Sequence, residues 1–184
     1  MYMKLLKRKP TKNNRVVTTT VTRLPIMPVF EQGLIVFARS FDDGMRVVTF
    51  EEPFVSPQST QLYLGKGESV DAALAQALHF FHNDGEEQTK FQVQVQDRGP
   101  AHVRKLNSRL DLWLAEHDGV MHAVSEDDGD VLVRLEGKVE PNNPASRYVT
   151  LEGAGNSYYG ALATALNQYS KYAPNAVSIA VTSA

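Results

Sequence analysis

The sequence contains no cysteine, one tryptophan and no long apolar run. Without cysteine there are no disulfides, no thiolate zinc ligands and no cysteine nucleophile, so stability must come from packing. No stretch approaches the roughly 18 consecutive apolar residues that a membrane-spanning helix needs. The N-terminal MYMKLLKRKP also lacks the apolar stretch and small-residue cleavage site of a secretory signal. We therefore expect a cytoplasmic protein without membrane contact.

Signatures of catalysis and of metal binding are missing as well. Serine, histidine and aspartate all occur, but none stands in a recognisable nucleophile motif. His79 and His82 are three residues apart, but the nearby acids fall beyond the expected helix end, so we interpret both as solvated histidines. The Asp-Asp-Gly stretches at 42–44 and 127–129 are typical of hairpin turns, where Asp bonds to backbone. We expect no enzyme, no metal and no cofactor.

Acidic residues are absent from residues 1–30, which hold seven basic ones. The other 154 residues hold 12 basic and 21 acidic side chains, so their balance is −9. A basic arm on an acidic body can neutralise phosphates, which gives salt-sensitive, sequence-independent nucleic-acid affinity. The alternative is a solvated tail. The seven basic residues are Lys4, Lys7, Arg8, Lys9, Lys12, Arg15 and Arg23.

Period-2 alternation is plentiful, whereas helical periodicity occurs only twice. Ser69 is a plausible N-cap for a helix that places Val70, Leu74, Ala77, Leu78 and Phe81 on one stripe and ends near residues 83–85. A tight turn at Asp43-Gly44 joins two of the expected strands. Strands are predicted at 15–23, 33–40, 45–52, 61–65 and 90–96.

The second half repeats this order closely. Strands are predicted at 110–116, 120–125, 130–137, 147–153 and 176–183, and Ser157 begins the second helix. We interpret this as an internal duplication. The predicted fold class is α+β, built from two ββββαβ repeats whose antiparallel sheets are each packed by one helix. The expected divisions are a basic flexible arm (1–13), the first repeat (14–97), a basic linker (98–108) and the second repeat (109–184), with the two repeats forming one compact domain.

GKGESVDAALAQALHFF (65–81) and GAGNSYYGALATALNQY (153–169) look like glycine-rich phosphate loops that run into helices. A dinucleotide fingerprint, however, would need a glycine where Val70 and Tyr158 stand, and the ending of a P-loop is also missing. We attribute these glycines to the sharp turn of a strand into a capped helix. Phosphate binding at these helix N-termini is the minor alternative.

A sheet that is covered by a helix on one side leaves its other face to solvent, to its duplicate or to a ligand. Gln and Arg can bond base edges or phosphates, and Tyr63, Phe91, Trp113 and Tyr148 can stack on bases if they are exposed. The alternative is that these aromatic residues are core. Beyond the arm, the candidate nucleic-acid contacts are Arg46, Lys90, Gln92, Gln94, Arg98, Arg104, Lys105, Arg109 and Arg134.

Four strands followed by a helix, twice over, resembles the Whirly and PUR-type modules, which bind single-stranded DNA or RNA across sheet surfaces. The resemblance is topological and covers nearly the whole chain. The lysine-bearing strand motif of plant Whirly proteins is not present, and each repeat has an extra strand after its helix. A small RNA-binding protein of a jumbo phage would look similar. The resemblance implies binding of single-stranded nucleic acid, preferably RNA, in a bacterial or phage-infected cell.

A rival resemblance is local. FARSFDDGMRVVTFEEP (37–53) followed by LGKGESVDAALAQALHFF (64–81) looks like the HicB-type antitoxin fold. HicB-like domains sequester a small toxin, so this resemblance implies an inhibitor or interaction module whose acidic body faces a basic protein partner. The DNA-binding tail of that family is missing. In either case, exposed sheet edges favour a homodimer, since pairing two edge strands hides them.

Overall fold

The computed structural model describes residues 15–19, 25–41, 43–53, 61–83, 91–95 and 101–172. The basic arm at 1–13 and the strand predicted at 176–183 lie outside these residues. Twelve elements follow one another along the described chain: β1 (Arg15–Thr19), α1 (Met27–Glu31), β2 (Ile35–Ser40), β3 (Arg46–Glu51), β4 (Gln61–Gly67), α2 (Val70–His82), β5 (Phe91–Val95), α3 (Ala101–Glu116), β6 (Val120–Ser125), β7 (Val131–Lys138), β8 (Tyr148–Gly155) and α4 (Tyr158–Tyr172).

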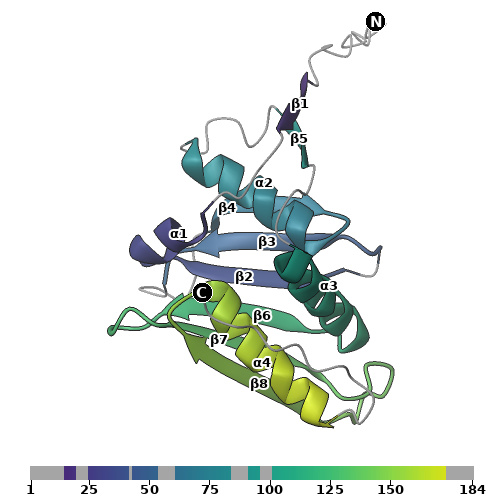
Figure 1. The fold of residues 1–184 in the computed structure, drawn as a ribbon. Helices are drawn as coiled ribbons and strands as arrows, with labels where there is room; N and C mark the ends of the chain where they lie inside the picture. The colour runs from purple at the N-terminus through teal and green to yellow at the C-terminus, as the bar shows by residue number, and fades with distance from the viewer. Residues whose placement is uncertain are drawn as a thin grey trace, which may run out of the picture.

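Six strands form one antiparallel sheet in the order β4-β3-β2-β6-β7-β8. The two halves of the chain meet at its centre, where β2 pairs with β6 and Val36 lies opposite Ala123. Helices α2, α3 and α4 lie on the same face of this sheet (Figure 1). The α+β class is confirmed, but the strands of both halves share one sheet instead of forming a separate sheet for each helix. Each half contains the order β-β-β-α, and the duplication itself stays a prediction.

Strands β1 and β5 are separate from this sheet. They form a two-stranded parallel pair in which Val17 lies opposite Val93. The expectation that all strands are antiparallel was wrong for this pair. Parallel strands need a long connection between them, and the chain between β1 and β5 provides one, since it contains the first hairpin and α2. The two strands can therefore run in the same direction.

The core lies between the sheet and its helices. Alternate residues of the strands, such as Val36 and Ala38 of β2 or Val133 and Leu135 of β7, are completely buried. They belong to one hydrophobic cluster that also contains the helix stripes of both halves, for example Leu74 and Leu162. The alternation that predicted the strands therefore marks the helix-facing side of the sheet, and the remaining strand residues define its open face.

Helix α3 corrects two expectations, the linker at 98–108 and the strand at 110–116. Residues 101–116 form one continuous helix. The alternation of Leu110, Leu112 and Leu114 suggested a strand, but Leu112 is 57% exposed while its two neighbours in that pattern are buried. The correct period is helical, since buried apolar residues recur every three or four positions. They are Val103, Leu106, Leu110, Trp113 and Leu114.

The glycines that resembled phosphate loops lie within β4 and β8 and not in turns. A Cβ atom on Gly65 would lie 1.8 Å from the Ala73 carbonyl oxygen, and one on Gly153 would lie 2.2 Å from the Ala161 carbonyl oxygen. Helices α2 and α4 therefore pack directly on the strand backbone, which only glycine permits. This close packing, not turn geometry, explains these residues.

The predicted helix caps and hairpin turns are confirmed. The Ala72 amide donates to Ser69 Oγ at 3.2 Å, and the Gly160 amide donates to Ser157 Oγ at 3.3 Å. Gly44 and Gly129 adopt φ values of 82° and 86°, as a tight turn requires. Local turn and cap chemistry was thus correctly predicted from the sequence in both halves.

Candidate functional site

Eight of the candidate contacts, including all five in the basic arm at 1–13, are not among the residues that the structure describes. Outside the described residues lie Lys4, Lys7, Arg8, Lys9, Lys12, Arg23, Lys90 and Arg98. Arg15, Gln92 and Gln94 are described only as parts of β1 and β5. Because those strands form their own pair, Gln92 and Gln94 do not belong to the six-stranded sheet. These two candidate contacts are therefore not part of that sheet's open face.

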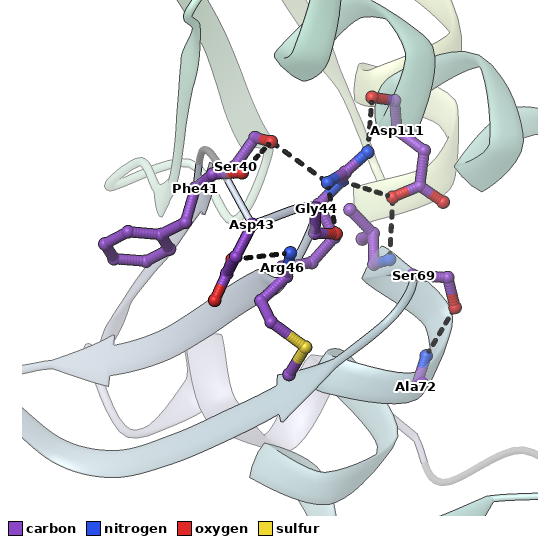
Figure 2. A network of polar contacts seen from close by, with 10 residues as sticks. Ser40, Phe41, Asp43, Gly44, Arg46, Ser69, Ala72 and Asp111 are labelled. Carbon is purple, nitrogen blue, oxygen red and sulfur yellow. Dashed lines mark hydrogen bonds and ion pairs between the residues drawn. The ribbon is translucent and has the colours of Figure 1, made fainter.

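Arg46 is held by the protein itself (Figure 2). Its Nε donates to Asp111 Oδ1 at 3.0 Å, and its Nη1 donates to Ser40 Oγ at 3.0 Å and to the Gly44 carbonyl oxygen at 2.7 Å. The side chain is 12% exposed. The guanidinium is therefore occupied by partners within the protein and is not a free cation, and a role for Arg46 in nucleic-acid contact stays a prediction.

Asp111 links three elements. From α3 it pairs with Arg46 of β3, and it also accepts a hydrogen bond of 2.8 Å from the Val70 amide at the start of α2. Burial raises the pKa of its carboxyl group, and the Val70 amide and Arg46 oppose that shift. This network ties Ser40, Gly44 and Arg46 of the hairpin between β2 and β3 to the helix layer.

The other predicted cations have different surroundings. Arg109 donates to the Leu166 carbonyl oxygen at 2.9 Å and to Asn167 Oδ1 at 3.2 Å, which joins α3 to α4, and burial lowers its pKa. Arg134 lies on the open face, where it forms an ion pair of 2.7 Å with Glu152. Arg104 and Lys105 are exposed on α3, on the helix side of the molecule. Among the predicted cations that the structure describes, only Arg134 lies on the open face of the six-stranded sheet.

The aromatic residues that were candidates for base stacking also differ in exposure. Trp113 is buried in the core, and Tyr63 packs edge-on against Phe81 with ring centroids 5.4 Å apart. Tyr148 is 72% exposed at the start of β8. The side chain of Phe91 lies outside the described part of the structure. For Trp113 and Tyr63, the alternative that they are core residues is the correct one.

The open face of β2, β3 and β4 contains a hollow that the sequence analysis missed. Phe37, Thr49 and Leu64 lie opposite one another across these strands. The hollow has a volume of about 540 Å³ and extends to the hairpin tip. Its lining combines apolar and charged side chains: Phe37, Arg39, Phe41, Asp43, Met45, Val47, Thr49, Glu51, Leu64 and Lys66. The available signal was the spacing of Phe37, Arg39 and Phe41, which alternate with the core residues of β2.

The cations and the carboxylates of this hollow differ in how far other protein groups already satisfy them. The Arg39 guanidinium lies 4.2 Å from the ring centroid of Phe41, and both Arg39 and Lys66 are exposed and form no ion pair with another described residue. The carboxylates are partly satisfied, since Asp43 accepts from the Met45 amide at 3.0 Å and Glu51 accepts from Thr49 Oγ1 at 2.6 Å. The cations are therefore the groups most available to a ligand.

A second hollow of about 430 Å³ lies beside the first and shares Phe41 with it. The hairpin contributes Ser40, Gly44 and Arg46 to its wall. The end of α3 and the segments that follow α3 and β7 supply the rest of the lining: Leu114, Ala115, Asp118, Pro141 and Asn142. Phe41, which is 40% exposed, is the residue that lines both hollows.

Across the described residues, no three His, Asp or Glu side chains are grouped so that they could hold a metal ion, and none of the described helices is long and apolar enough to cross a membrane. His79 and His82 both lie on α2, and His82 is exposed. Comparison of the chain with protein-family models, with curated proteins and with solved structures gives no match.

Proposed function

We propose that this protein is a non-enzymatic binder of single-stranded nucleic acid, preferably RNA, which holds a base in the hollow on the open face of β2, β3 and β4. One observation carries the proposal: this hollow combines the ring surfaces of Phe37 and Phe41 with two cations, Arg39 and Lys66, that no described carboxylate pairs. Flat apolar surface next to free positive charge is what a nucleotide needs, because its base stacks and its phosphate is anionic.

The size of the hollow agrees with this ligand. Small-molecule sites typically have volumes of about 300–1,000 Å³, and the hollow has about 540 Å³. Stacking of a base on an aromatic side chain contributes about 1–3 kcal/mol and accepts every base. The site supports capture of single strands, because a duplex keeps its bases stacked on one another.

The basic arm adds affinity in this proposal. Five of the seven positive charges of residues 1–30 lie in the arm at 1–13, and residues 31–184 have a balance of −9, so the arm attracts the backbone while the acidic body repels it elsewhere. The arm therefore contributes a salt-sensitive term that is independent of base identity, and the hollow contributes the stacking term.

Fluorescence anisotropy with labelled single-stranded RNA, single-stranded DNA and duplex DNA at two salt concentrations tests the proposal. Arg39→Gln and Lys66→Gln each remove one positive charge from the hollow, and Lys105→Gln removes the same charge from the exposed side of α3. We expect the two hollow variants to bind single strands several-fold more weakly, with the salt slope reduced by about one for each lost phosphate contact. Lys105→Gln should bind like the parent protein.

A chain that begins at Asn14 separates the arm from the hollow. We expect it to bind single strands more weakly and with a smaller salt slope, but to retain its sensitivity to Lys66→Gln. Absence of binding to all three nucleic acids would overturn the proposal. Equal binding by the parent protein and both hollow variants would show that the hollow is not the site.

An inhibitor of a basic protein is the second candidate, and the hairpin between β6 and β7 favours it. Glu126, Asp127 and Asp128 are exposed there and form no ion pair with another described residue. Exposed acids without a cationic partner among the described residues suit a basic partner such as the toxins that HicB-like proteins sequester. Titration calorimetry with a toxin of that kind should then show binding that is lost when all three acids are changed to their amides.

A further inference from the structure

We propose that the second hollow receives the next base of the strand, so that Phe41 separates two successive bases. This inference rests on the proposed function and deepens it, because it defines the ligand as a dinucleotide step. It starts from the observation that one exposed aromatic residue, Phe41, lines two hollows of similar size, about 540 and 430 Å³.

The backbone of Phe41 is held by hydrogen bonds within the turn, and its ring contacts the Arg39 guanidinium. The Phe41 amide donates to the Met45 carbonyl oxygen at 2.9 Å, and the Gly44 amide donates to the Phe41 carbonyl oxygen at 2.9 Å. Arg46 braces the same turn through Gly44 and ties it to Asp111 of α3 (Figure 2). A ring on a braced turn loses little conformational entropy when a ligand packs against it.

The two hollows offer different chemistry. In the first, the Arg39 guanidinium covers one region of the Phe41 ring, and Phe37 supplies a further apolar surface. The second is more polar, with the Asn142 amide, the Ser40 hydroxyl group and the Asp118 carboxylate in its wall. Asp118 is paired with Lys138 at 2.9 Å, whereas Asn142 is exposed. Asn142 is therefore the group best suited to bond the edge of the second base.

Two adjacent 2-aminopurine bases in a single-stranded RNA report on this separation, because stacking on each other quenches their fluorescence. We expect their fluorescence to rise when the parent protein binds, since Phe41 separates the two bases. Phe41→Ala should abolish the rise and weaken binding by about tenfold, the order of one stacking contact. Asn142→Ala should weaken binding to a dinucleotide and leave binding of a mononucleotide unchanged. Asn156→Ala, an exposed Asn→Ala change beside α4, is the matched control.

The outcomes separate the two proposals. If anisotropy shows no binding of the RNA, the proposed function is wrong. If the RNA binds and depends on Lys66 but its fluorescence does not rise, the function stands and the separation of two bases by Phe41 is wrong. Equal effects of Asn142→Ala on mononucleotide and dinucleotide binding would likewise overturn the second subsite.

Discussion

At the scale of single residues, the neighbouring groups determine whether a basic side chain is exposed to ligands or is bound within the fold. Arg46 has three polar partners and is nearly buried, whereas Arg39, on the adjacent strand, is exposed and contacts the Phe41 ring but forms no ion pair with another described residue. The two are indistinguishable by residue type. The alternation of residues along a strand shows that Arg39 and Arg46 lie on opposite faces of the sheet. It does not show that Arg46 is paired, because its partner Asp111 comes from α3.

Arg46→Ala should lower the free energy of unfolding by about 1–3 kcal/mol, because the partly buried Asp111 carboxylate loses its cationic partner and the Gly44 carbonyl oxygen loses a donor. Arg134→Ala is the control, since that ion pair is exposed on both sides and such pairs contribute about 0–1 kcal/mol. Urea unfolding of both variants measures the difference. Losses of the same size would show that the Arg46 network does not stabilise the hairpin.

The pH dependence of stability should report on His122. Burial lowers the pKa of its imidazole, which packs edge-on against Phe37 with ring centroids 4.9 Å apart; Glu136 and Glu51 oppose the shift and Arg134 adds to it. A lowered pKa means that the unfolded chain takes up the proton more readily. The stabilisation is therefore fully present above the ordinary value of about 6.5 and is lost as the pH falls through the folded pKa.

Comparison with His122→Gln isolates this contribution. Between pH 8 and pH 5 the parent protein should lose more unfolding free energy than the variant, because only the parent carries the perturbed imidazole. Unfolding curves recorded at several pH values check this. Parallel pH profiles for the two proteins would contradict it.

At the scale of elements, the sequence predicted strands, caps and hairpin turns well, because these depend on local patterns. Ser69 and Ser157 cap their helices, and both Asp-Asp-Gly turns form as expected. The sequence failed at α3, where the alternation of Leu110, Leu112 and Leu114 concealed a helical stripe. It also failed for the hollow at Phe37, because which side of β2 stays open depends on where three helices pack.

Close packing of helices on strands gives a prediction for β4. Gly65→Ala places a Cβ atom against the backbone of α2, so α2 must move and the free energy of unfolding should fall by more than about 2 kcal/mol. Gly155→Ala is a milder change, since its Cβ atom would lie 3.3 Å from the nearest backbone atom of α4. Thermal unfolding of both variants tests this, and equal melting temperatures would show that α2 adapts without cost.

At the scale of the whole molecule, the two edges of the sheet determine how copies can associate. β4 and β8 are the outer strands, and an unprotected edge invites pairing with another chain. Each edge is occupied at one point by a glutamine from the helix above it. The Lys66 amide donates to Gln76 Oε1 at 2.6 Å, and Gln168 both accepts from the Glu152 amide and donates to the Glu152 carbonyl oxygen.

These contacts oppose the edge-to-edge homodimer that the sequence suggested, because pairing there must displace Gln76 or Gln168 from the backbone. Changing both to Ala should therefore lower the protein concentration at which dimers form. The backbone amides of Lys66 and Glu152 would then lack an acceptor at the sheet edge, and an edge strand of a second copy can supply one. Size-exclusion chromatography with light scattering over a micromolar concentration series measures the mass, with Thr164→Ala on the exposed side of α4 as the control. If the double variant and the parent have the same mass at every concentration, Gln76 and Gln168 do not prevent pairing of the sheet edges. Any dimer must then form through another surface.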